Sequence, residues 1–195
     1  MRRSILTTIT LLYFCLSWAQ IAVGTRDNQY IYGEFQHKGW MVKLEESVFA
    51  EKMAHQYLRL YAGYRYEMPL WSLSVQPYFG TSYNGNYCSS GCLVTGKYHL
   101  MDKYHFKAIL NPHYDSGYKY ETNFLIGAGA DLSSQIGIKL EYQEMPIYRM
   151  KEKRLKCGFI FRTGNLSASP QLSIPTEGET KNIRCIVDFR YCFLK

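Results

Sequence analysis

One short segment, NPHYDSGY (111–118), brings a histidine, an acid and a serine close together in the sequence. Acyl transfer by a serine nucleophile needs a histidine within hydrogen-bond reach and donors for the oxyanion. His113, Asp115 and Ser116 supply these residue types and would suit a lipid-modifying enzyme. We favour the alternative, in which they are loop and interfacial residues, because His113 falls on the lumen face of its predicted strand and Ser116 lies in a Tyr/Gly loop. No catalytic residue is therefore assigned.

A second candidate for chemistry is the cysteine pair Cys88 and Cys92, which lies among Gly, Asn and Ser residues typical of a loop. In an exported protein the pair could form a small disulfide at a loop tip, and the alternative is two free thiols. Their C-x3-C spacing has no second pair at metal-site distance, so we expect no metal and no cofactor. Metal-ligand spacing is also lacking among the other histidines, His37, His55, His99 and His105.

The first twenty residues, MRRSILTTITLLYFCLSWAQ, have the pattern of an export signal. A basic start is followed by an apolar run (5–16) and small residues that end at Ala19. We therefore expect residues 1–19 to be a signal peptide that is removed after Ala19. A lipoprotein signal at Cys15 is the alternative, but the bulky Phe14 precedes it where a small residue is expected.

Length and composition limit the fold of the chain after the signal. The 195 residues allow one domain, so residues 20–195 are expected to fold as a single unit. They hold no apolar run long enough for a spanning helix, whereas a spanning strand needs only about 9–11 residues. The 18 tyrosines suit a membrane interface, although a Tyr-rich soluble sheet would share them. The net charge of +7 does not indicate nucleic acid, because the chain is exported and has no basic cluster with stacked aromatics.

Strands are the elements expected to position these residues. Apolar and polar residues alternate with period two along most of the chain, and helix signals are almost absent. In the segment 182–194, for example, Val187 and Phe189 share one face and Asp188 and Arg190 the other. Strands are predicted at 30–35, 40–48, 57–67, 71–80, 92–99, 104–113, 120–130, 136–143, 154–162, 166–174 and 182–194. Whether residues 20–28 hold a further strand is left open.

The connections between these strands alternate in length. Short ones are expected at 36–39, 68–70, 100–103, 131–134 and 163–165. Longer ones are expected at 49–56, 81–91, 114–119, 144–153 and 175–181. Tight turns on one side and longer loops on the other are typical of outer-membrane barrels. The sequence therefore predicts an all-β protein, an antiparallel up-and-down transmembrane β-barrel of about 10–12 strands.

Alternation alone does not say which face points inward. A soluble barrel of this strand number would need a large ligand to fill an apolar interior, whereas a membrane barrel turns its apolar face to lipid. We therefore expect lipid to contact Phe124, Ile126, Ala128, Ile136, Ile138 and Leu140. The lumen-facing candidates are then Arg59, Arg65, Glu67, Lys107, Lys139, Glu141, Arg162, Arg184, Asp188 and Arg190. In the alternative, a soluble barrel, these charges would form an ordinary solvated surface.

The segment GAGADLSSQIGIKLEYQ (127–143) resembles a hairpin of small porin-like and OmpA-like outer-membrane barrels of Gram-negative bacteria. In that hairpin a G-x-G strand and a strand ending in Tyr flank a short periplasmic turn. The resemblance implies insertion into the lipid of the cell outer membrane. Members of the family commonly end their last strand at a terminal aromatic residue. This chain instead ends Phe193-Leu194-Lys195, so that signature is displaced by two residues.

Three functions are compatible with such a barrel. The first is a structural or porin-like role, in which a lumen richer in Lys and Arg than in Asp and Glu would favour small anionic solutes. The second is a barrel-embedded enzyme that modifies lipids. The third is a surface-binding barrel that acts through its longer loops, notably 81–91 and 144–153. The sequence favours the first hypothesis without naming a ligand.

Overall fold

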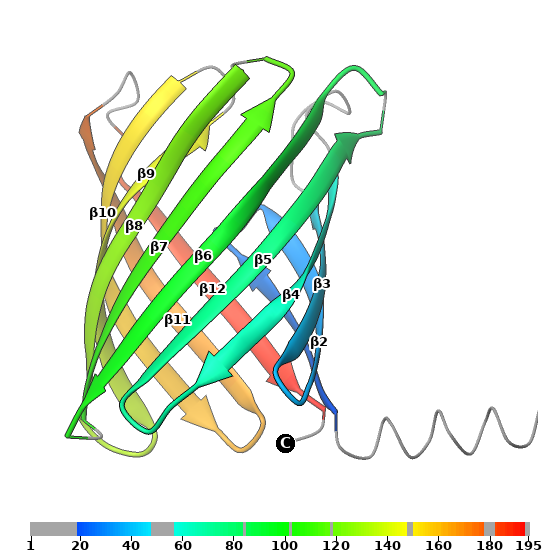
Figure 1. Ribbon diagram of the computed structural model, residues 1–195. Helices are drawn as coiled ribbons and strands as arrows, with labels where there is room; N and C mark the ends of the chain where they lie inside the picture. Colours follow the sequence, from blue (N-terminus) through cyan, green and yellow to red (C-terminus); the bar gives the residue numbers. More distant parts are fainter. Residues whose placement is uncertain are drawn as a thin grey trace, which may run out of the picture.

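The computed structural model describes residues 19–47, 57–83, 85–101, 103–117, 119–147, 150–177 and 182–193. The expected signal peptide lies outside these residues except for Ala19. Within the described ranges, twelve antiparallel strands close into one barrel (Figure 1). No helix in this part of the chain is long and apolar enough to cross a membrane. The predicted all-β barrel is therefore confirmed, and its strand number lies at the upper end of the prediction.

The strands follow one another around the barrel in sequence order. They are β1 (Gln20–Arg26), β2 (Tyr30–His37), β3 (Trp40–Ser47), β4 (Tyr57–Glu67), β5 (Trp71–Ser82), β6 (Cys88–Leu100), β7 (Tyr104–Asp115), β8 (Lys119–Asp131), β9 (Ile136–Ile147), β10 (Met150–Thr163), β11 (Leu166–Glu177) and β12 (Arg184–Cys192). The segment whose structure the sequence left open thus forms β1. Eleven strands lie where period two predicted them, and most are longer than predicted.

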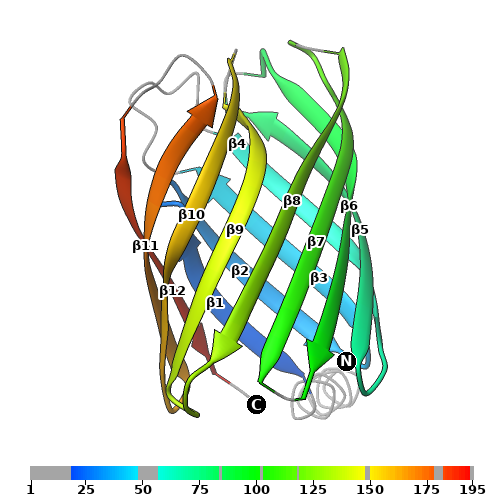
Figure 2. The ribbon, with the colours of Figure 1, turned by 90° about the vertical axis from the view of Figure 1, so that its left-hand side faces the viewer.

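The two ends of the barrel differ in their connections. The end that we call the turn end carries the connections 38–39, 68–70, 101–103, 132–135 and 164–165. Strand β1 begins and β12 finishes at this same end (Figures 1 and 2). The opposite end, which we call the loop end, carries the connections 27–29, 48–56, 83–87, 116–118, 148–149 and 178–183. The predicted short turns are therefore found close to their predicted positions.

Two of the predicted longer loops are mostly strand. Strand β6 begins at Cys88, so the predicted loop 81–91 shrinks to 83–87. Strands β9 and β10 run to Ile147 and from Met150, so most of the predicted loop 144–153 belongs to a hairpin. The sequences of these two segments are polar or contain Gly and Ser, so they have low strand propensity and did not predict the extensions. The strands extend nevertheless, because pairing with a neighbouring strand outweighs local propensity.

The barrel closes through its shortest ladder. Strands β7 and β8 pair along twelve residues each, whereas β1 and β12 pair only from Ala22 opposite Cys192 to Gly24 opposite Arg190. At Gly24 the strands approach so closely that a Cβ atom would lie 2.3 Å from the carbonyl oxygen of Phe189. A side chain at this position would therefore push the closing strands apart.

Beyond the short ladder, the turn between β1 and β2 continues the closure with side-chain bonds. Asp27 and Asn28 both have positive φ, which Asp and Asn tolerate better than most residues. The Asn28 amide donates to the carbonyl of Cys185, and its Oδ1 accepts the backbone N–H of Val187. One side chain thus satisfies backbone groups of β12 that have no strand partner at this height.

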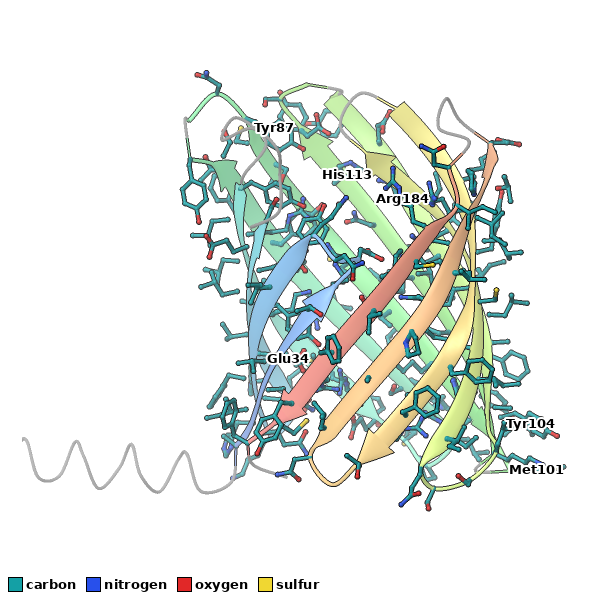
Figure 3. All side chains as sticks on the ribbon, turned by 180° about the vertical axis from the view of Figure 1, so that it is seen from behind. Glu34, Tyr87, Met101, Tyr104, His113 and Arg184 are labelled. Atoms are coloured by element: carbon teal, nitrogen blue, oxygen red, sulfur yellow. The ribbon has the colours of Figure 1, made fainter. Side chains whose placement is uncertain are left out.

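Apolar side chains cover the outside of the barrel. Ile138 is 39% exposed and Leu140 51%, whereas the inward Lys139 between them is partly buried. At the turn end, aromatic pairs such as Trp40 with Tyr64 are exposed on the outer surface. Tyr104 of β7 also projects away from the wall near the turn end, on another side of the barrel (Figure 3). The apolar face of the strands therefore points outward, and the polar face points into the barrel.

Candidate functional site in the barrel interior

Alternation along the strands sends one polar side chain inward at every second position. The structure places all ten predicted lumen residues on this inward face. They come from β4 (Arg59, Arg65, Glu67), β7 (Lys107), β9 (Lys139, Glu141), β10 (Arg162) and β12 (Arg184, Asp188, Arg190). The barrel thus collects on one interior surface charges that lie up to 131 positions apart in the chain, from 59 to 190.

The loop-end half of the interior is built around Glu45 of β3, which is fully buried. Arg26 and Lys43 each donate to a different carboxylate oxygen of Glu45 at 2.9 Å. The Arg59 guanidinium lies 3.9 Å from the carboxylate, and the Tyr61 hydroxyl donates to it at 3.2 Å. We call these five residues the Glu45 cluster. One buried carboxylate is therefore shared by three cations, and the cluster keeps a net positive charge.

Aromatic rings complete the surroundings of these cations. The Arg59 guanidinium carbon lies 4.8 Å from the ring centroid of Tyr57 and 4.7 Å from that of Tyr78. The Lys43 ammonium lies 4.4 Å from the Tyr61 ring. Such cation–π contacts gain strength where water is excluded. The tyrosines therefore stabilise a cation excess that the single carboxylate does not neutralise.

A second set of contacts links β1 to strands on the far side of the closing seam. Lys156 of β10 forms an ion pair with Asp27, although β11 and β12 lie between β10 and β1 around the wall. The backbone N–H of Asp27 donates to Asp188 at 2.7 Å, and the Gln171 amide donates to the other oxygen of Asp188 at 2.7 Å. Together with the Glu45 cluster, these bonds form a packed level of buried side chains in the loop-end half.

The turn-end half carries ion pairs that water reaches more easily. Arg162 pairs with Asp131 at 2.7 Å. Arg190 pairs with Glu34 at 3.3 Å. Arg65 lies 3.5 Å from Glu67, whose side chain is 63% exposed. These charges therefore lie in a hydrated space, unlike the Glu45 cluster.

Two inward lysines form no ion pair in the described part of the chain. Lys97 of β6 lies within electrostatic range of Arg65, Lys107 and Arg190, so its neighbours are mainly cations. Lys139 lies near Glu141, but the carboxylate of Glu141 pairs with Lys107. The interior consequently offers two ammonium groups whose charge is not matched by a bonded carboxylate.

The sequence interpretation missed several inward acids. Glu34 follows the period-two pattern of β2 and could have been found from it. Asp27 lies in the start of the chain that the sequence left open, and Asp131 was assigned to a turn, although it ends β8. Each of these carboxylates pairs with a Lys or Arg of the interior. The excess of basic over acidic groups is therefore smaller than the sequence indicated.

The candidate disulfide between Cys88 and Cys92 is absent from the structure, in which both residues are free thiols. They lie four residues apart on one strand, β6, rather than at a loop tip. An antiparallel strand rises about 3.4 Å per residue, which separates their Cα atoms by roughly 13 Å. A disulfide bridges Cα atoms at most about 7 Å apart, so the extension of β6 through this segment excludes the bond.

The candidate acyl-transfer residues are also kept apart. The Ser116 hydroxyl accepts the backbone N–H of Cys88, on the neighbouring strand. His113 is buried, with Nδ1 3.0 Å from the carbonyl oxygen of Asn111 and Nε2 3.8 Å from Asp115. Both ring nitrogens therefore face groups other than Ser116. The structure does not assemble the serine and histidine into an activated pair.

One hydrogen bond attaches the connection after β5 to strand β3 at the loop end. Tyr83, which follows β5, donates its hydroxyl proton to Glu46 of β3 at 2.5 Å. This hydrogen bond to a carboxylate raises the pKa of Tyr83 above its ordinary value. Tyr83 therefore stays protonated at neutral pH and ties the 83–87 connection to the wall.

Comparison with known proteins places the fold. No protein-family model matches the sequence, and no curated protein matches it. Two structures of the KdgM porin match with TM-scores of 0.66 and 0.65, at 10% and 9% identity. Each match covers 90% of this chain and 98% of the porin. One of the two structures shows the KdgM porin in complex with disordered oligogalacturonate. The NanC porin matches with a TM-score of 0.56 at 9% identity, covering 89% of this chain and 97% of its own. The chain therefore has the fold of small porins, as its sequence resemblance predicted.

Proposed function

We propose that this chain is a porin-like protein of the outer membrane that passes small anionic solutes through a basic lumen. Residues 1–19 would direct its export, and residues 20–195 would form the barrel. Its outer wall would contact the lipid of the membrane. The similar fold of the KdgM and NanC porins supports this proposal, and the KdgM complex shows one such barrel with an anionic saccharide.

The observation that carries the proposal is the pair of unmatched ammonium groups, Lys97 and Lys139. Most interior carboxylates are bonded to a Lys or Arg, so they present little free negative charge to a passing ion. Lys97 adds its charge to those of Arg65 and Lys107. Cations that line a narrow, low-dielectric passage raise the local concentration of anions. The lumen should therefore prefer anions, although its net charge is modest.

The packed level in the loop-end half sets the size limit in this proposal. There the Glu45 cluster and the pair of Asp27 with Lys156 bring long side chains together across the interior. Passage at this level needs a solute that is small, or one that exchanges its own anionic groups for the carboxylates on these cations. Small anions satisfy either condition and are the substrate class that we propose.

Planar lipid bilayers under a salt gradient provide the test. The folded protein should give discrete conductance steps with a reversal potential on the anion-selective side. Replacing both lysines (Lys97→Gln with Lys139→Gln) should move the reversal potential towards zero without abolishing the steps. The matched control is Lys153→Gln, which removes an ammonium group that pairs with Glu177 rather than facing the lumen. A cation-selective or silent folded protein would contradict the proposal.

A further inference from the structure

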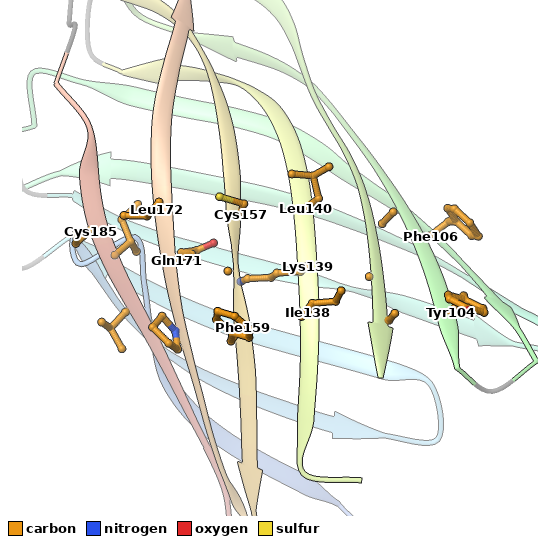
Figure 4. Close-up of a pocket in the computed structure, with 17 residues that line it drawn as sticks. Tyr104, Phe106, Ile138, Lys139, Leu140, Cys157, Phe159, Gln171, Leu172 and Cys185 are labelled. Atoms are coloured by element: carbon orange, nitrogen blue, oxygen red, sulfur yellow. The ribbon is translucent and has the colours of Figure 1, made fainter. Parts of the chain in front are cut away.

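The outer wall carries an apolar groove of about 780 Å³ that spans strands β7 to β12 (Figure 4). Tyr104 and Phe106 of β7 border it at one edge, and Ile138 and Leu140 of β9 face them across β8. Its lining is almost entirely apolar. The groove lies on the outward face, so it is separate from the polar interior and from the proposed path of solutes.

The register of three strands shapes the part of the groove between β7 and β9. Ala128 of β8 lies between Phe106 and Leu140, and Ala130 lies between Tyr104 and Ile138. Two alanines thus form a floor between four larger side chains. Because these pairs follow one another along β8, the hollow runs along that strand towards the turn end.

A cation lies where the hollow reaches the turn end. Lys103 belongs to the turn between β6 and β7, and its carbonyl accepts the backbone N–H of Asp131, the last residue of β8. Its ammonium lies 5.6 Å from the ring centroid of Tyr104. The side chain is exposed and forms no ion pair with any residue that the structure describes. Tyr104 itself has an apolar ring and a polar hydroxyl, a combination favoured at a membrane–water interface. The apolar groove therefore has, beside Tyr104 at its turn end, an ammonium group that no carboxylate of the described residues pairs with.

We propose that this groove binds one phospholipid, with an acyl chain along β8 between β7 and β9 and the phosphate at Lys103. An apolar hollow ending at a cation matches a molecule with a hydrocarbon chain and an anionic head. A free phosphate ion would use only Lys103, and a second copy of the chain would bring a like charge to Lys103. The inference rests on the membrane location proposed above, which places the outward face in lipid.

Native mass spectrometry of the barrel, extracted from membranes in a mild detergent, tests the inference. The unmodified protein should retain one phospholipid per barrel. Filling the floor with Ala128→Leu and Ala130→Leu should remove that adduct. Lys103→Gln should lower its occupancy about fivefold, as expected for one interfacial Lys near an anionic head group. These changes add apolar groups to an apolar surface or neutralise a turn residue, so a heat-modifiable band should show that each variant folds.

Two matched controls should retain the lipid. Ala62→Leu enlarges an outward alanine on β4, away from the groove, and Lys38→Gln neutralises an exposed lysine in the turn between β2 and β3. Equal adducts in every variant would mean ordinary surrounding lipid and would overturn the inference. So would a protein dimer without lipid, or no adduct at all. Loss of conductance with the lipid retained would instead contradict the proposed function alone.

Discussion

The two halves of the interior use the same residue types for different purposes. In the loop-end half, Glu45 is fully buried and Arg154 is 2% exposed, so their charges are satisfied by protein groups alone. In the turn-end half, the side chains of Glu67 and Arg190 are 63% and 43% exposed. Water can therefore replace a partner that is lost at the turn end, but it cannot do so at the loop end.

This difference separates charges that hold the barrel together from charges that act on solutes. A buried ion network is costly to break, because the remaining charges are left without either a partner or water. An exposed pair contributes little to stability, because water screens it. We therefore expect substitutions at the loop end to change folding and substitutions at the turn end to change selectivity.

The largest effect is expected from Glu45→Ala. Removing this carboxylate leaves Arg26, Lys43 and Arg59 as neighbouring buried cations, and breaking a buried pair in this way typically costs about 3–5 kcal/mol. The free energy of unfolding in urea, measured in lipid vesicles by the loss of the heat-modifiable band, gives the cost. Glu67→Ala is the control, and its cost should stay below about 1 kcal/mol. Equal losses of unfolding free energy in the two variants would show that the loop-end charges stabilise the barrel no more than the turn-end charges do.

A somewhat smaller effect is expected on the outer wall. Ile138→Arg places a charge on the apolar face near the turn end of β9, and it should destabilise the barrel by less than the roughly 2–4 kcal/mol that a charge costs at the membrane midplane. The neighbouring variant Lys139→Gln changes an inward residue and should fold normally. Assembly into lipid vesicles, judged by the same electrophoretic shift, compares the two. Normal assembly of Ile138→Arg would show that lipid does not contact this face.

How far the sequence predicted this arrangement depends on the range of the interactions. Period two is a local property, so it located eleven strands and placed Ile138 and Lys139 on opposite faces. Strand β1 was left open because its inward positions include Gly24 and Ala22, which give a weak pattern. The pair of Asp27 with Lys156 joins residues 129 positions apart. Such a contact depends on where the barrel closes, which alternation does not specify.

The smallest effect on stability is expected at the turn end. Arg65→Gln removes a partner of the exposed Glu67, so the free energy of unfolding should change by no more than about 0.5 kcal/mol. Because Arg65 lies beside Lys97, the reversal potential should nevertheless move away from the anion-selective side. Paired measurements of unfolding and selectivity on one preparation compare the two effects. A large loss of stability without a change in selectivity would reverse the roles assigned to the halves.

Fractionation of cells that express the full-length chain tests the central claim most directly, namely that the apolar face meets lipid and the polar face lines the interior. The fractions would be compared by electrophoresis with and without boiling. We expect recovery in the outer membrane, as a band whose mobility changes on boiling. Recovery as a soluble protein in the periplasm or the medium would contradict it, because the exposed apolar wall would then have no lipid to cover it.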